Sequence, residues 1–307
     1  MMKLFPQGDR VFEVISRYDD LLTMEGREGY EPGDTLALIV PFLVLHNISE
    51  ADIATLASRA TLTPGAAELV ASLRAGGWEV FCITTTYEQY AHFITRKLGI
   101  SAANVASTPF PLDRLSQTLC QEDTALLQQI EQDILAISAD DAMIKRKLDA
   151  FFWKRLPQTR LGRVTREVKP IGGRRKVAAL DRFCESSGMP LSHWAVVGDS
   201  ITDFRMLRAV DYAGGLAIAF NANQYALPYA TMSLASTSLS DLTPVLRAWQ
   251  ASGRDGAEKV VKAEEEAGGR ENRQNFHWLS GRKELYDVIA IHKRLRHLVR
   301  DEAGKLG

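Results

Sequence analysis

The sequence has little cysteine and lacks any long apolar run. Its three cysteines are odd in number and far apart, which argues against a disulfide framework and favours reduced thiols: Cys82, Cys120 and Cys184. No apolar stretch reaches the roughly 18 residues that a membrane span requires. The most apolar early stretch, residues 36–45, contains Pro41, and charged residues from Asp9 onward interrupt any signal-peptide core. We therefore expect a cytoplasmic protein with no membrane insertion.

The chain also lacks an excess of charge of either sign. It has 37 Lys and Arg against 38 Asp and Glu, a formal net charge of −1. A general nucleic-acid binder would need a basic excess, so we expect no nucleic-acid partner. With 307 residues, of which 46% are hydrophobic, the chain is long enough for two units or for one domain with a large insert.

Residues 1–62 are predicted to form a small helical domain. Asp9 and Asp34 stand where N-caps are expected, before apolar residues that recur at helical spacing. Ser49 opens a third helix, and Asp52 follows three residues later, which is a weak capping-box pattern. No segment in this region has the pattern of a strand.

Residues 63–245 alternate between helical and strand patterns, which is typical of an α/β fold with a parallel sheet. Helices are predicted after Pro64, over residues 87–98, from Lys176 to residue 185, and over residues 203–209. The predicted strands are residues 78–83, residues 193–197, Leu216–Phe220 and Met232–Ser236.

Two further regions are predicted around this core. Residues 101–168 form an insert with helices over 123–137 and 140–153 and a strand over 161–168. Residues 246–307 form a C-terminal helical extension, with a loop around residues 268–275 and an amphipathic helix over 284–299. One face of that helix carries basic residues that could dock a protein partner, although a solvated face is the commoner explanation: Lys293, Arg294, Arg296 and Arg300.

The clearest chemical signal is Gly198-Asp199-Ser200-Ile201-Thr202-Asp203, which directly follows an apolar strand. Ligands of parallel sheets bind beyond the carboxyl ends of the strands, and two carboxylates there suit Mg²⁺, which prefers oxygen ligands. The alternative makes Asp199 a turn residue and Asp203 an acidic residue at a helix N-terminus.

Three weaker signals could complete a phosphate site. The run Thr84-Thr85-Thr86 ends an earlier strand, where hydroxyl and N–H groups can hold a phosphate. Lys176 opens the helix that leads to the acidic strand and can offer its ammonium to a phosphoryl group. Asn221 follows the next strand and is a candidate substrate contact. Taken singly, a β-branched strand end and a solvated lysine are the commoner explanations.

In this order, the hydroxyl, the lysine and the Gly-Asp-x-x-x-Asp turn resemble motifs II, III and IV of the haloacid dehalogenase (HAD) superfamily. Residues 64–80 (PGAAELVASLRAGGWEV) are also similar to that superfamily's approach to motif II. A narrower resemblance lies in residues 5–20 (FPQGDRVFEVISRYDD) and 86–90 (TYEQY). These look like HAD proteins termed energy-converting hydrogenase subunit R-like, which resemble phosphoserine phosphatase in carrying a helical cap between motifs I and II.

Motif I of that superfamily, a strand that ends in the nucleophilic Asp, is absent from this sequence. Asp19-Asp20 follows a helical pattern and Asp34 follows Pro32-Gly33, so neither ends a strand. The resemblance places the missing strand at the centre of the sheet, where its loss would leave unpaired backbone groups that cost about 1–3 kcal/mol each. We therefore expect a start codon assigned too late or a fragment that is short of about 20 residues. Translation of the DNA upstream of Met1 tests this expectation.

For a complete protein, the resemblance implies Mg²⁺-dependent phosphomonoester hydrolysis through an aspartyl-phosphate, with no turnover from a chain that lacks motif I. Asp199 and Asp203 would serve the metal, Lys176 would neutralise charge on the phosphoryl oxygens, and Thr84 and Thr85 would bind them. The partner would be a small phosphorylated substrate chosen by the helical cap. The alternative is a non-catalytic HAD-like module that binds a phosphorylated ligand or a partner protein.

Overall fold

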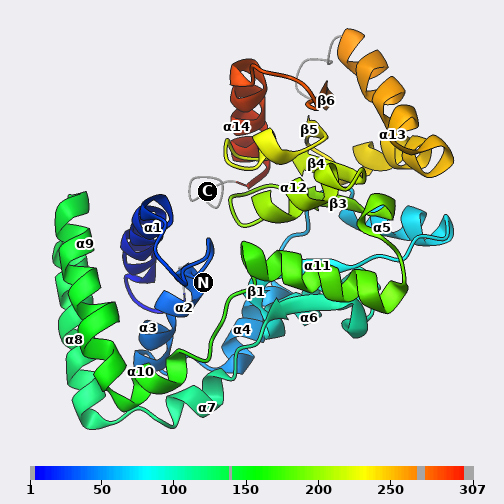
Figure 1. Ribbon diagram of the computed structural model, residues 1–307. Coiled ribbons are helices and arrows are strands. Elements are labelled where there is room, and N and C mark those ends of the chain that lie inside the picture. Colours follow the sequence, from blue (N-terminus) through cyan, green and yellow to red (C-terminus); the bar gives the residue numbers. More distant parts are fainter. Residues whose placement is uncertain (1–3, 138–139, 268–273, 301–307) are drawn as a thin grey trace. The chain divides into compact units, whose positions relative to one another are not determined.

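The computed structural model describes residues 4–137, 140–267 and 274–300, and these residues form two compact units (Figure 1). Within the described residues, unit 1 comprises segments 4–60, 84–95 and 105–172. Unit 2 comprises segments 61–83, 96–104 and 173–300. The fold is mixed α/β and contains parallel strands, as expected from the alternating pattern of the sequence.

Unit 1 is mainly helical. Its helices are α1 (Gly8–Glu25), α2 (Thr35–Leu38), α3 (Val40–Leu45), α4 (Glu50–Ser58), α6 (Glu88–Lys97), α7 (Leu112–Ser116), α8 (Gln121–Ala136), α9 (Asp141–Asp149) and α10 (Arg160–Thr165). A π-helical turn (Ala150–Arg155) and a 3₁₀ turn (Leu156–Gln158) join α9 to α10. Strands β1 (Cys82–Tyr87) and β2 (Val105–Thr108) make a sheet of two strands.

One hydrophobic core joins the N-terminal helices to the segment after β2. Tyr18 and Phe42 from the N-terminal helices are fully buried in the same cluster as Leu127 and Phe151. The expected grouping of residues 101–168 with the α/β core therefore differs from the structure, which packs most of this insert with residues 4–60. Hydrophobic contact decides the grouping, because α8 and α9 have apolar faces that α1 and α3 cover.

In unit 1, the structure confirms the predicted capping box but not the predicted strand. The capping box of Ser49 and Asp52 is confirmed at the start of α4, and the α1–α4 region contains no strand. The predicted strand over residues 161–168 is wrong, because that segment begins as helix α10. The Thr159 side chain accepts a hydrogen bond from the Gly162 N–H, and this cap outweighs the strand preference of the β-branched residues.

Unit 2 contains a sheet of four strands in the order β3 (Ala195–Gly198), β4 (Leu216–Phe220), β5 (Met232–Ser236) and β6 (Gln274–Trp278). The pairs β3–β4 and β4–β5 are parallel, and β5–β6 is antiparallel. Every residue of β4 and β5 is buried, which explains the continuous apolar sequence of β4. β3 lies at the end of this strand order, and its residue Val197 is 41% exposed.

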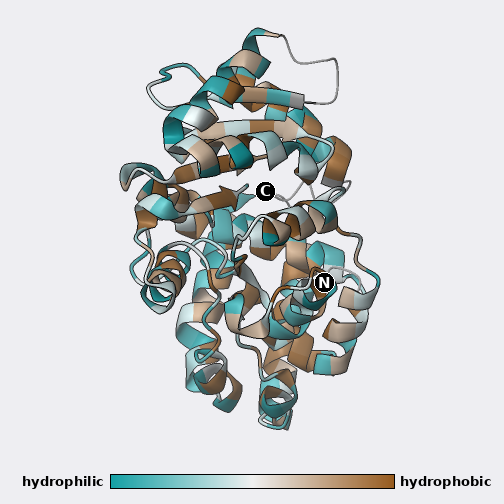
Figure 2. Cartoon of the chain, turned by 90° about the vertical axis from the view of Figure 1, so that its right-hand side faces the viewer, coloured by the Kyte–Doolittle hydropathy of each residue, from teal (hydrophilic) through white to brown (hydrophobic). Residues whose placement is uncertain are grey.

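Helices of unit 2 are amphipathic, with brown apolar and teal polar residues alternating along the ribbons in Figure 2. They are α5 (Ala66–Ala75), α11 (Arg174–Ser187), α12 (Phe204–Tyr212), α13 (Thr243–Glu266) and α14 (Tyr286–Arg300). Short 3₁₀ turns occur at Ala102–Asn104, Leu191–His193, Leu227–Tyr229 and Leu239–Leu242. The predicted C-terminal extension is part of this unit, because β6 pairs with β5 and α14 packs on β5.

Two predicted strands and one predicted loop need correction. The strand predicted over residues 78–83 begins only at Cys82 and continues through the threonines to Tyr87. The strand predicted over 193–197 begins at Ala195, because a 3₁₀ turn takes up His193. Gln274 and Asn275 were predicted in a loop but lie in β6, whereas residues 268–273 are outside the described part of the chain.

Two expectations from composition have structural counterparts. All three cysteines are free thiols. No single helix in the described ranges is long and apolar enough to cross a membrane, although the bent pair Thr35–Leu45 and Glu50–Ser58 reaches that composition and length when taken together.

Candidate functional site

The turn after β3 is organised by the carboxylate of Asp203. Asp203 Oδ2 accepts hydrogen bonds from the N–H groups of Asp199 (3.0 Å) and Ser200 (3.1 Å) and from the Ser200 hydroxyl (3.2 Å). Gly198 permits this closure, because a Cβ at that position would lie 2.6 Å from Asp203 Cβ. The glycine and the second aspartate of the motif are therefore both needed for the shape of the turn.

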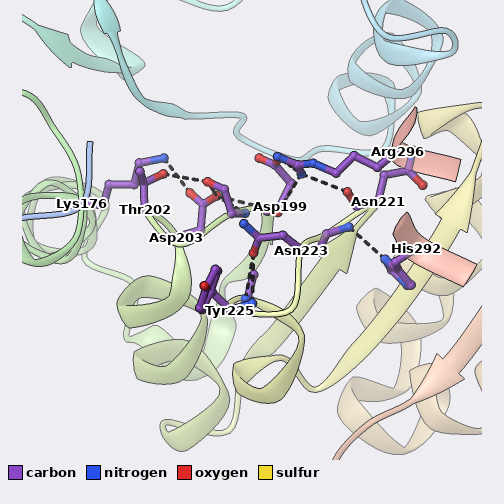
Figure 3. A network of polar contacts seen from close by, with 12 residues as sticks. Lys176, Asp199, Thr202, Asp203, Asn221, Asn223, Tyr225, His292 and Arg296 are labelled. Atoms are coloured by element: carbon purple, nitrogen blue, oxygen red, sulfur yellow. Dashed lines mark hydrogen bonds and ion pairs between the residues drawn. The ribbon is translucent and has the colours of Figure 1, made fainter. Parts of the chain in front are cut away.

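Lys176 and Asp203 form a buried ion pair. Lys176 Nζ lies 2.6 Å from Asp203 Oδ1, and the two side chains are only 7% and 5% exposed (Figure 3). Burial by itself would raise the pKa of Asp203, but the Lys176 ammonium and the hydrogen bonds from the turn lower that pKa below its ordinary value. The predicted lysine and the predicted turn thus meet at the carboxyl end of β3.

The start of α11 is tied to the same turn by its backbone. Gly173 N–H donates to the carbonyl of Thr202 at 3.0 Å, and Gly173 has a φ of +52°, which favours glycine. This bond places the first turn of α11, and with it Lys176, beside the loop that carries Asp203. The glycine pair before Lys176 in the sequence therefore has a positioning role.

Asp199 is paired with an arginine that lies almost 100 residues later. Arg296 Nη1 donates to Asp199 Oδ2 at 2.6 Å, and Arg296 is only 4% exposed (Figure 3). We predicted Arg296 on an exposed basic face of the C-terminal helix, and that placement is wrong. Lys293 and Arg294 are exposed as expected, whereas the side chain of Arg300 is outside the described part of the structure.

Asn221 holds two strand ends together. Its Nδ2 donates to the Ser236 carbonyl (2.7 Å), and its Oδ1 accepts the Ser236 N–H (2.9 Å). Asn221 is 2% exposed and has a φ of +44°. The structure therefore gives this residue, predicted as a substrate contact, a role in joining the ends of β4 and β5.

The loop after β4 also receives His292 of α14. His292 Nδ1 accepts the Ala222 N–H at 2.9 Å, and the ring is fully buried. Burial, together with the nearby His277, lowers the pKa of His292 to about 3, so the ring is neutral at physiological pH. The Asn223 N–H in the same loop donates to the Asp199 carbonyl at 2.9 Å.

Thr84 and Thr85 belong to unit 1, where their hydroxyls have local partners. Thr84 Oγ1 accepts the Thr86 N–H at 3.2 Å, and Thr85 Oγ1 donates to the Ile171 carbonyl at 2.9 Å. Within unit 2, the structure brings together Lys176, Asp199 and Asp203. The sequence reasoning missed Arg296 and His292 as parts of this site, although their spacing of four residues on an otherwise apolar helical face was a usable signal.

The donor set at this site, as arranged, does not fit the expected Mg²⁺. Oxygen ligands are present, but a guanidinium nitrogen already lies 2.6 Å from Asp199 Oδ2. Both oxygens of Asp203 accept hydrogen bonds from Lys176 and the turn. No group of three His, Cys, Asp or Glu side chains in the described residues is placed to hold a metal ion.

This chain is similar to a solved structure from an archaeon. The structure of gene product AF1437 from Archaeoglobus fulgidus superposes with a TM-score of 0.84 at 30% sequence identity. The match covers 97% of this chain and 90% of that chain. No family model and no curated protein matches this sequence.

Proposed function

This chain belongs to the same family as the Archaeoglobus fulgidus gene product AF1437, and we propose that it is a HAD-type phosphohydrolase whose unit 2 binds phosphoryl groups beside Lys176. The single observation that carries the proposal is the buried Lys176–Asp203 pair at the carboxyl end of β3. Two motifs separated by 27 residues converge there, at the edge of a parallel sheet where ligands of such folds bind.

Lys176 is the group that would meet the phosphoryl oxygens. An ammonium has three N–H donors, and Asp203 accepts one of them at 2.6 Å. The pairing holds Lys176 in one orientation, so little side-chain entropy remains to be lost when an anion binds. The role that the HAD resemblance implies for Thr84 and Thr85 in binding phosphoryl oxygens stays a prediction.

Hydrolysis requires the nucleophilic aspartate of motif I, which the motifs of this sequence do not include. The Mg²⁺ ion expected at Asp199 and Asp203 stays a prediction. A cytoplasmic location and a small phosphorylated substrate belong to the same proposal.

Binding of inorganic phosphate tests the proposal directly. We expect phosphate titration of ¹⁵N-labelled protein to shift the amide signals of residues 198–203 and of the first turn of α11. Lys176→Met should weaken phosphate binding by about tenfold or more, because hydrogen bonds to charged groups contribute about 1.5–3 kcal/mol. The exposed Lys259 on α13 provides the matched control, Lys259→Met, which should bind as the wild type does. Shifts confined to other regions of the wild-type protein would contradict the proposal even if Lys176→Met does not fold.

A second candidate function is a non-catalytic module that binds a phosphorylated ligand. The specific observation in its favour is that both carboxylates of the motif are paired with cations, Asp199 with Arg296 and Asp203 with Lys176. The two candidates differ in turnover. Release of p-nitrophenol from p-nitrophenyl phosphate by a protein that includes a motif I strand, lost in Lys176→Met, supports the hydrolase. Phosphate binding by that protein without any turnover supports the module.

A further inference from the structure

A single nitrogen of Arg296 is surrounded by three oxygen atoms. Nη1 lies 2.6 Å from Asp199 Oδ2, 3.0 Å from the Asp199 carbonyl and 3.2 Å from the Asn221 carbonyl. One carboxylate and two carbonyls are the ligand types that hard cations use in proteins. A positively charged nitrogen therefore occupies a position whose surroundings have the chemistry of a cation site (Figure 3).

The fold holds this nitrogen in place from several sides. His292, one turn before Arg296, accepts the Ala222 N–H, and the apolar side chains of Val288 and Leu295 are buried on the same helix. Arg296 itself is only 4% exposed. Its Nε has no hydrogen-bond partner among the described residues. Burying a guanidinium is costly unless its charge is compensated, and here Asp199 supplies that compensation.

We infer that Arg296 is the resident cation of the Asp199 site, and that a divalent ion binds there only in competition with the docking of Arg296. A metal ion and the guanidinium nitrogen cannot both occupy the position bounded by Asp199 Oδ2 and these two carbonyls, because Nη1 already lies 2.6–3.2 Å from all three oxygens. The C-terminal part of α14 thereby controls whether the first aspartate of the motif is available to a metal ion.

The inference concerns the site of the proposed function but depends on cation binding alone. Asp199 is 27% exposed on its side chain, so the carboxylate remains accessible to an ion once the guanidinium is removed. The inference would therefore hold for a hydrolase and for a non-catalytic module. Its test needs no turnover, and failure of the phosphate experiments would leave it standing.

Manganese binding, measured by the loss of the free Mn²⁺ signal in electron paramagnetic resonance, is the direct test. We expect weak binding to the wild type and at least about tenfold tighter binding to Arg296→Met, since a competing charge within about 4 Å is removed. Arg296→Lys keeps the positive charge, so this variant should still bind Mn²⁺ weakly. Arg294→Met, which changes an exposed arginine on the same helix, should bind as the wild type does. Adding Asp199→Asn to Arg296→Met should abolish the gained site.

Two results would overturn the inference. One is a folded Arg296→Met protein, verified by circular dichroism, that binds Mn²⁺ no more tightly than the wild type. The other needs only the wild type: tight Mn²⁺ binding with unchanged amide hydrogen exchange across Tyr286–Arg300 would show that the ion and the docked helix are compatible. Faster exchange in this helix at saturating Mn²⁺ is the expected result.

Discussion

Lys176 Nζ and Asp203 Oδ1 lie 2.6 Å apart in the interior of unit 2, although 27 residues separate them in the chain. Their pairing fixes both the start of α11 and the turn after β3, because Asp203 also accepts the N–H groups of Asp199 and Ser200. The pair is therefore structural before any ligand binds.

Removal of the lysine should destabilise the protein strongly. Lys176→Met leaves the buried Asp203 carboxylate without its cation, and breaking such a pair costs about 3–5 kcal/mol. Urea unfolding followed by tryptophan fluorescence measures this loss in the free energy of unfolding. The double variant Lys176→Met/Asp203→Asn should lose less than the sum of the single variants, and strict additivity would contradict the pairing.

At position 221, glycine should destabilise the protein less than alanine does. Asn221→Ala loses both hydrogen bonds to Ser236 and places an alanine at a φ of +44°, so a loss of about 2–4 kcal/mol is expected. Asn221→Gly loses the same bonds but removes the backbone strain, and it should be the less destabilised of the two. Thermal and urea unfolding of both variants give the comparison. A glycine variant less stable than the alanine variant would refute this explanation of the φ angle.

The neutral, buried His292 should make stability depend on acid pH. Its pKa is lowered to about 3 in the fold, so the unfolded chain takes up a proton below its ordinary pKa of 6.5 before the native state does. The contribution of neutral His292 to the free energy of unfolding is complete above pH 6.5. It is lost as the pH falls toward 3, by at most about 1.4 kcal/mol per pH unit.

The variant that isolates this effect is His292→Asn, whose amide oxygen can still accept the Ala222 N–H but cannot titrate. Its urea midpoint should fall less between pH 7 and pH 4.5 than that of the wild type. His193→Asn changes an exposed histidine and should retain the wild-type profile. Identical profiles for His292→Asn and the wild type would contradict the prediction.

Asp19 of α1 should make the protein less stable as the pH rises, opposite to the effect of His292. Burial raises its pKa to about 6, although hydrogen bonds from Tyr30 and Thr35 partly oppose this shift. The stabilising contribution of the neutral acid is therefore complete below about pH 3.8 and is lost as the pH rises through 6.

Substitution of Asp19 by asparagine should stabilise the protein at pH 7.5 relative to the wild type and make little difference near pH 4. The amide keeps an acceptor for the Tyr30 hydroxyl and carries no charge. The melting temperature measured across this pH range provides the test, with Asp255→Asn on the exposed side of α13 as its control. A variant that is less stable than the wild type at pH 7.5 would show that the charged form is preferred.

The sequence determined the features that depend on near neighbours in the chain. The apolar run of β4 predicts a buried parallel strand, and the pair Ser49 and Asp52 predicts the start of α4. The turn from Gly198 to Asp203 could be predicted because its glycine and its second carboxylate act within six residues. Such features are decided by local hydrogen bonds and by hydrophobic periodicity.

Other features depend on partners far along the chain. The polar start of β6 has no strand pattern, and it becomes a strand because β5 offers it a ladder of backbone hydrogen bonds. The sequence predicts Asn221 as a substrate contact, whereas the fold places Ser236 of β5 beside it as a hydrogen-bond partner.

The clearest case is Arg296. By sequence alone it is one of several basic residues on an amphipathic helix, and Lys293 and Arg294 on that helix are indeed exposed. Only the tertiary structure places its guanidinium against Asp199, because packing of α14 on the sheet decides which face of the helix is buried. Sequence therefore predicted the acidic turn and its lysine, whereas the tertiary structure decided which cation the first aspartate holds.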